Sequence, residues 1–112
     1  MTNNVKTDVE LTKHPKYEGV FMKHFFCKDD NDRLNNFEIN IEPGFQIAPH
    51  IHDSSSEFFY VVSGQGEFLD DTEWVAIKKG YAFKAPTNMT HAIKNTGSET
   101  LVLFSTFSPA IR

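Results

Sequence analysis

The sequence predicts an all-β domain, and three observations support this fold class. Apolar and polar residues alternate along short runs, as in residues 37–42, where one Phe and two Ile share a strand face. Turn-forming residues separate these runs at short intervals. The sequence shows no helical periodicity of useful length. A small β-barrel or sandwich is therefore expected.

The expected strands follow one another along most of the chain. They cover residues 20–27, 37–42, 45–52, 57–63, 66–69, 73–77, 81–84, 91–95 and 101–107. Turn signals rich in Gly, Pro, Asn and Asp separate most of them, at residues 42–44, 63–66, 70–72, 78–80, 85–88 and 95–97. Residues 1–18 lack this pattern and are expected to form an N-terminal arm.

The strand at residues 57–63 needs its own argument, because Ser54 and Glu57 also match the loose pattern of a helix capping box. Residues 58–62 are aromatic and β-branched, and Gly64 follows closely, so a strand is favoured over a helix. Alternation then places Phe59 on the same face as Glu57, and the residues on either side of Phe59 on the opposite face.

Length and composition restrict the class of protein. A chain of 112 residues suits one domain, here residues 1–112. Its hydrophobic content of 39% is too high for intrinsic disorder, and no apolar run is long enough to span a membrane. Eleven basic against fifteen acidic residues give a net charge of −4, and without a basic cluster this argues against nucleic-acid binding.

The N-terminal sequence predicts the cellular location, and the cysteine content excludes an internal disulfide. The N-terminus has no apolar core after a basic start, so we expect no signal peptide and a cytoplasmic location. Cys27 is the single cysteine and cannot form an internal disulfide. Its aromatic neighbours predict a buried thiol on a strand.

Four side chains form the candidate site. His50 and His52 are separated by one residue, so on a strand both project from one face and can converge on one ion. Glu57 follows a short polar loop and begins an apolar strand, where an unpaired carboxylate would be costly to bury. His91 begins another strand after a turn. Three imidazoles and one carboxylate suit a divalent transition metal (Mn, Fe, Co, Ni, Cu or Zn) and leave one or two positions for water or substrate.

The spacing of these residues follows two glycine-framed motifs. Residues 44–64 read Gly, five residues, His50, one residue, His52, four residues, Glu57, six residues and Gly. Residues 80–95 read Gly, five residues, Pro, then His91 five residues on and Asn four further on. This pattern resembles the two motifs of the cupin superfamily, G(X)5HXH(X)3,4E(X)6G and G(X)5PXG(X)2H(X)3N. Asn88 replaces one glycine, and Asn tolerates the positive φ that such a turn requires.

The cupin resemblance implies a single-domain double-stranded β-helix, or jelly-roll barrel, around one divalent transition metal per chain. It also implies that His50, His52, Glu57 and His91 are the metal ligands. Because the fold hosts many reactions, the function stays open. The first alternative is a metalloenzyme acting on an oxygen-bearing small molecule, of dioxygenase, isomerase or lyase type. The second is a non-catalytic, metal-loaded barrel that binds or senses a small ligand.

A third alternative is an isomerase of uronate-derived keto sugars. Residues 106–109 are similar to the FSP ending of small cupins that process such sugars. The likeness is incomplete, because residues 103–106 lack the carboxylate that those proteins carry, and Glu57 stands where they commonly have Gln.

Further residues are expected around the metal and on the outer surface. The candidates for lining the cavity are Phe37, Phe45, Phe59, Met89, Phe104 and Phe107. Neither His14, which we expect in a solvated loop, nor His24 is expected to be a ligand. Outward-facing apolar positions predict a homodimer, to which residues 5–11 could add a strand. The other expected partner is a small-molecule ligand or substrate.

Overall fold

The protein is described by a computed structural model that covers residues 4–30 and 33–112. These residues form ten strands and no helix, so none of them belongs to a helix that could cross a membrane. The strands are β1 Thr12–Lys13, β2 Val20–His24, β3 Asn35–Ile41, β4 Gln46–His50, β5 Ser56–Ser63, β6 Gln65–Asp70, β7 Glu73–Lys78, β8 Ala82–Ala85, β9 His91–Asn95 and β10 Leu101–Ser108. The predicted all-β class is confirmed.

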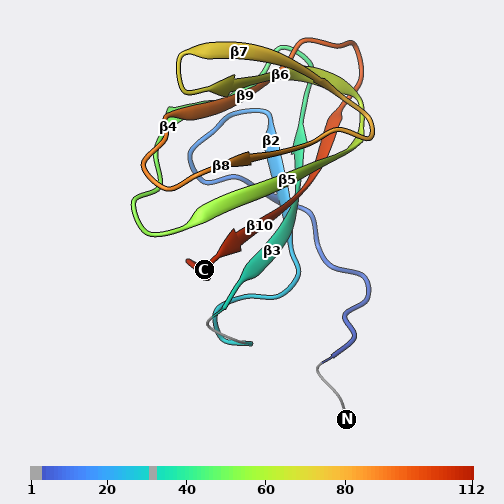
Figure 1. Ribbon diagram of the computed structural model, residues 1–112. Helices are drawn as coiled ribbons and strands as arrows, with labels where there is room; N and C mark the ends of the chain where they lie inside the picture. Colours follow the sequence, from blue (N-terminus) through green and yellow to red (C-terminus); the bar gives the residue numbers. More distant parts are fainter. Residues whose placement is uncertain (1–3, 31–32) are drawn as a thin grey trace.

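The strands form two antiparallel sheets that enclose one core (Figure 1). One sheet has the order β1-β2-β3-β10-β5-β8 and the other the order β4-β9-β6-β7. The core draws on both, as where the ring of Phe59 in β5 lies 6.1 Å from that of Phe68 in β6. This is the arrangement of a jelly-roll barrel.

Alternation along the strands produces this core. In β3 the even-numbered positions are half-buried, whereas Phe37, Ile39 and Ile41 are buried. In β5 the same period buries Phe59 and Val61 and exposes their neighbours, as the sequence predicted.

Two chain connections cross between the sheets at the same end of the barrel. Residues 51–55 lead from β4 to β5, and residues 86–90 lead from β8 to β9. The second connection contains the predicted left-handed residue, since Asn88 has φ 67° and its N–H donates to the carbonyl of His52 at 2.8 Å. The two motifs therefore meet where the sheets are joined.

The strand predicted for residues 20–27 ends early, at His24. The chain turns there, because Asp30 Oδ2 accepts a hydrogen bond from the Cys27 N–H at 2.7 Å, and the Asp30 N–H donates to the Cys27 carbonyl at 2.9 Å. Cys27 is consequently a half-buried turn residue, and the expectation of a buried strand thiol is wrong. The expected N-terminal arm likewise contains a short strand, β1, which pairs with β2.

Candidate metal centre

The four predicted metal ligands converge at the end of the barrel where the sheets are joined. His50 is the last residue of β4, and it lies opposite His91, the first residue of β9, in the strand register. Glu57 lies near the start of β5 in the other sheet, and His52 lies on the connection between β4 and β5. The HxH pair therefore spans the end of a strand and the loop that follows it.

One atom from each side chain meets the other three in a small volume. The Nε2 atoms of His50 and His52 are 3.2 Å apart. Glu57 Oε1 lies 3.6 Å from His52 Nε2 and 3.4 Å from His91 Nε2. All four candidate ligand atoms lie within 4.8 Å of one another. Because metal–nitrogen bonds are about 2.0–2.1 Å long, donors on opposite sides of one ion lie about 4 Å apart, so the cluster has the size that one ion requires.

Surrounding hydrogen bonds fix the orientation of these groups. His50 Nδ1–H donates to the Ala48 carbonyl at 2.7 Å, and His91 Nδ1–H donates to the Met89 carbonyl at 3.1 Å. Since Nδ1 carries the proton in each neutral ring, Nε2 keeps a free lone pair. Ser105 donates its hydroxyl to Glu57 Oε2 at 2.6 Å, which leaves Oε1 directed at the imidazoles.

His91 provides the test of whether a cation fits. The residue is 1% exposed, and within residues 4–30 and 33–112 its Nε2 is the buried side-chain atom without a hydrogen-bond partner. A buried nitrogen left unsatisfied costs about 1–3 kcal/mol. Because its lone pair faces the Glu57 carboxylate, which is also an acceptor, a cation between them satisfies both groups. The residues present therefore fit a divalent metal.

His50 and His52 are also kept neutral, as metal binding requires. Burial lowers the pKa of His52 from its ordinary 6.5 to about 4, against the opposing effect of the Glu57 carboxylate. Burial likewise lowers the pKa of His50, and the hydrogen bond to the Ala48 carbonyl offsets part of that shift. At neutral pH both rings present lone pairs rather than an additional proton.

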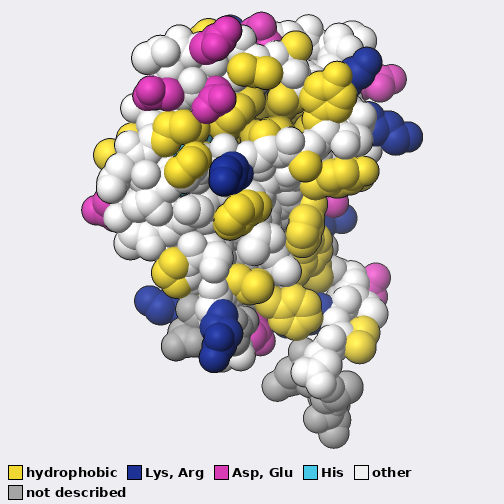
Figure 2. Space-filling view, viewed as in Figure 1, with side chains coloured by type: hydrophobic (Ala, Val, Ile, Leu, Met, Phe, Trp, Pro, Cys, Tyr) yellow, Lys and Arg dark blue, Asp and Glu magenta, His cyan; other side chains and the backbone are white. Residues whose placement is uncertain are grey.

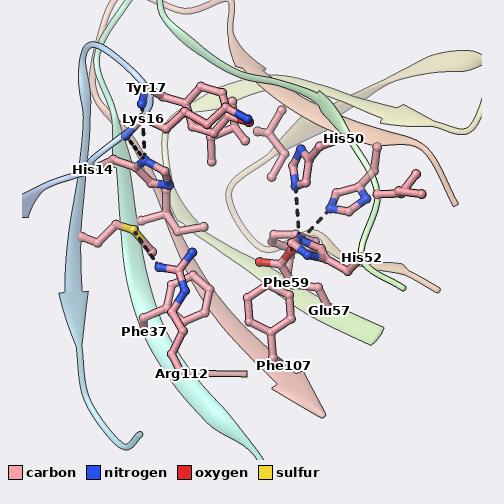
Figure 3. Close-up of a pocket in the computed structure, with 16 residues that line it drawn as sticks. His14, Lys16, Tyr17, Phe37, His50, His52, Glu57, Phe59, Phe107 and Arg112 are labelled. Carbon is pink, nitrogen blue, oxygen red and sulfur yellow. Dashed lines mark hydrogen bonds and ion pairs between the residues drawn. The ribbon is translucent and has the colours of Figure 1, made fainter. Parts of the chain in front are cut away.

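The cluster faces a cavity of about 280 Å³ (Figure 3). Apolar side chains make up much of its wall, among them Ile39, Ile47 and Ile93. His14 and Arg112 lie across the cavity from His50 and His52, and Tyr17 lies between them, with its ring 6.5 Å from that of His50. A small molecule in the cavity could therefore reach the ion.

The predicted pocket residues divide into three groups. Phe37, Phe59 and Phe107 line the cavity, and the ring of Phe107 packs edge-on against His52 with centroids 4.7 Å apart. Met89 contacts the core but lines a separate depression between β7 and β8.

Phe45 and Phe104 lie outside the cavity, contrary to the expectation. Both are 38% exposed. In β10 the alternation directs Leu103 and Ser105 inward, and Phe104 between them points outward. Phe45 precedes β4 and packs its ring against Gly19, so it holds the turn before β2.

Sequence reasoning missed four polar residues that line the same cavity as the cluster. These are His14, Lys16, Tyr17 and Arg112, and His14 is half-buried instead of lying in a solvated loop. They lie outside both motifs, and the sequence signal was limited to basic and aromatic residues near each end of the chain. His24 packs near Phe37, with ring centroids 5.9 Å apart, and does not line the cavity.

Comparison with known proteins identifies the family. The model of the cupin domain family matches residues 37–107, which is more than half of the chain. The chain therefore belongs to the cupin family, and the resemblance seen in the two motifs is confirmed.

Two proteins of known name are similar to this chain in sequence. The chain is 32% identical over 84 residues to an oxalate-binding protein of Thermotoga maritima, a match that covers 73% of this chain and 69% of that protein. It is 33% identical over 69 residues to the polyketide synthase CurC of Streptomyces cyaneus, covering 62% of this chain and 45% of CurC. The match to CurC thus spans less than half of that protein.

A solved structure with the same fold is that of a predicted oxalate decarboxylase from Thermotoga maritima. The TM-score is 0.82 at 24% identity, and the match covers 91% of this chain and 94% of that one. At this identity the likeness shows the shared fold.

Proposed function

We propose that the protein is a metal-dependent cupin that binds a small carboxylate at an ion held by His50, His52, Glu57 and His91. The unpaired, buried Nε2 of His91 carries this proposal, because a metal ion completes the arrangement that the four side chains form. When bound, a divalent transition metal supplies Lewis-acid or redox chemistry to an oxygen ligand. The residues named here hold and orient it.

A carboxylate is the ligand class that the cavity favours. Four protein ligands leave one or two positions open at a five- or six-coordinate ion, and among the candidate metals Mn²⁺ is the one best suited to carboxylate oxygen. Lys16 and Arg112 add positive charge to the wall, whereas the one acidic side chain among the described lining residues, Glu57, faces the ion. The oxalate-binding relative supports the same ligand class.

If the protein is an enzyme, the bound metal supplies the catalytic chemistry. Among the described lining residues, Glu57 is the carboxylate available as a general base, and it is directed at the imidazoles. A dioxygenase-, isomerase- or lyase-type reaction at the ion is therefore the enzymatic form of this proposal. A ligand bound without turnover is its non-catalytic form.

The keto-sugar isomerase is the weaker alternative. Phe107 of the FSP-like tail lines the cavity, which agrees with it. Ser105, two residues earlier, is buried and hydrogen-bonded to Glu57, so no acid is present there to move a proton.

The proposal is tested by titrating acetate and oxalate into Mn²⁺-loaded protein, metal-free protein and the His52→Ala variant in a calorimeter. We expect carboxylate binding to the loaded protein and at least tenfold weaker binding to the other two. Equal affinity in all three samples would exclude a carboxylate site at the ion. Oxygen uptake with the loaded protein then separates redox chemistry from ligand binding.

A further inference from the structure

The cavity has a second set of polar side chains, His14, Lys16, Tyr17 and Arg112, which we call the distal pole. His14 and Arg112 lie across the cavity from His50 and His52 (Figure 3), whereas the ring of Tyr17 lies 6.5 Å from that of His50. Of the distal pole, His14, Lys16 and Tyr17 come from the turn between β1 and β2, and Arg112 follows β10. All four of these residues lie outside residues 37–107, where the family model matches, so the distal pole belongs to this chain's own flanking segments.

His14 presents a fixed hydrogen-bond donor to the cavity. Its Nδ1 accepts hydrogen bonds from the backbone N–H groups of Lys16 at 3.0 Å and Tyr17 at 3.3 Å. An accepting Nδ1 carries no proton, so the proton of the neutral ring is on Nε2. That nitrogen lies on the side of the ring that faces the cavity (Figure 3). Burial, followed by the nearby Arg112, lowers the pKa of His14 and favours this neutral form.

The turn that carries His14 is held in place by contacts with the barrel. The His14 N–H donates to the Val20 carbonyl at 2.8 Å, and the Glu42 N–H donates to the Gly19 carbonyl at 2.9 Å. The ring of Phe45 covers Gly19 so closely that an added Cβ would lie 2.2 Å from it. Tyr17 packs on His14 with ring centroids 4.8 Å apart. His14 is therefore positioned before any ligand arrives.

Arg112 is directed to the same place. The backbone beside it is tied to β3, because the Ile111 N–H donates to Asn35 Oδ1 at 2.9 Å. Its guanidinium lies 6.0 Å from the centroid of Phe37, with Nη1 3.9 Å from Met22 Sδ. Within the described residues these contacts are with a ring and a thioether rather than a carboxylate, so most of its N–H donors are available to a ligand.

The size of the cavity limits the ligand. The cavity of about 280 Å³ lies just below the usual range of about 300–1,000 Å³ for ligand pockets, which favours a small ligand. Such a molecule would meet a cation at one end of the cavity and the imidazole N–H and guanidinium at the other. Both ends favour negative charge.

We propose that the ligand is a small dicarboxylate, with one carboxylate at the metal and the second at the distal pole, where His14 Nε2–H and the Arg112 guanidinium donate to it. This inference rests on the proposed function, because the first carboxylate requires the ion. His14 and Arg112 thereby select dicarboxylates over monocarboxylates of the same length.

The experiment compares succinate with butyrate, and malonate with propionate, by titration calorimetry on Mn²⁺-loaded protein. The variants are Arg112→Gln, which removes the guanidinium charge, and His14→Phe, which keeps an aromatic ring but removes the donor. Lys79→Gln is the matched control, because it removes one positive charge at an exposed site away from the cavity. Circular dichroism and metal content are measured on every sample.

We expect at least one dicarboxylate to bind about tenfold more tightly than its matched monocarboxylate, as one additional charge-assisted hydrogen bond implies. Arg112→Gln and His14→Phe should each weaken dicarboxylate binding more than monocarboxylate binding and so remove most of that preference, and Lys79→Gln should leave the preference unchanged. Equal affinities in the wild type, or a preference that survives both variants, would overturn the inference. Failure of the proposed function would differ, since monocarboxylate affinity would then be the same with and without metal.

Discussion

At the residue scale, the buried imidazole of His91 connects folding to metal binding. Its Nε2 has no hydrogen-bond partner among the described residues, and it faces the Glu57 carboxylate at 3.4 Å. Two acceptors in contact without a proton or a cation between them are unfavourable in a buried site. The barrel therefore keeps this arrangement at a cost that a bound ion removes.

His52→Ala should lose most of the bound metal while the barrel stays folded. The His52 side chain is 23% exposed and lies on a loop, so its removal leaves the packed core intact. Elemental analysis and circular dichroism check the two halves of this prediction. Global unfolding of the variant would instead mean that the ion is structural.

Ser105→Ala should weaken metal affinity by about tenfold, because the hydroxyl orients Glu57 and loss of such a partner typically costs 10–100-fold. Chelator competition measures the change. Ser108→Ala is the matched control, since Ser108 lies on the same strand with its side chain exposed. Unchanged affinity in Ser105→Ala would show that the carboxylate needs no orientation from β10.

At the element scale, β5 contributes residues to both the hydrophobic core and the candidate metal centre. Glu57 begins its inward face, and Phe59 follows two residues later, stacked on Phe83 with ring centroids 4.7 Å apart and interplanar angle 15°. The same alternation thus places a candidate ligand and a core aromatic residue next to each other on the inner face of β5.

Phe59→Ala should lower the free energy of unfolding by about 3–5 kcal/mol, because the side chain is 4% exposed and its removal leaves a cavity. Denaturant titration provides the measurement. Its neighbour Phe58 is 45% exposed, so Phe58→Ala should cost well under half as much. Similar losses in both variants would contradict the assignment of the two faces.

Elements with local signals could be predicted from the sequence, and contacts between distant segments could not. Strict alternation located β3 and β5, and the glycine-framed spacing located His50, His52, Glu57 and His91. Phe104 was misplaced because an apolar side chain alone does not say which face of β10 is inward. His14 was missed because its turn is held through Gly19 by Glu42 and Phe45, which are distant in sequence.

At the scale of the whole molecule, the part of the larger sheet's outer face formed by β5 and β10 carries several exposed apolar side chains. Phe58, Tyr60 and Val62 of β5 are between 42% and 48% exposed, and Phe104 of the adjacent β10 is 38% exposed. Figure 2 shows hydrophobic side chains gathered on the face over β5, β8 and β10, with few charged ones among them. We call this group the outer patch. Solvent exposure of so many large apolar groups favours self-association.

The predicted homodimer should form through the outer patch. Tyr60→Lys combined with Phe104→Lys should shift the protein towards the monomer without unfolding it, because both side chains point away from the core. Sedimentation velocity at micromolar concentration measures the shift. A wild-type monomer under these conditions would contradict the predicted dimer.

The metal centre is tested most directly by elemental analysis of the purified protein beside the His50→Ala/His52→Ala double variant. We predict about one transition-metal ion per chain in the wild type and almost none in the variant, with similar circular dichroism spectra for the two proteins. Wild-type protein that takes up no metal, even when Mn²⁺, Fe²⁺, Co²⁺, Ni²⁺, Cu²⁺ and Zn²⁺ are supplied in turn, would contradict the assignment of this site.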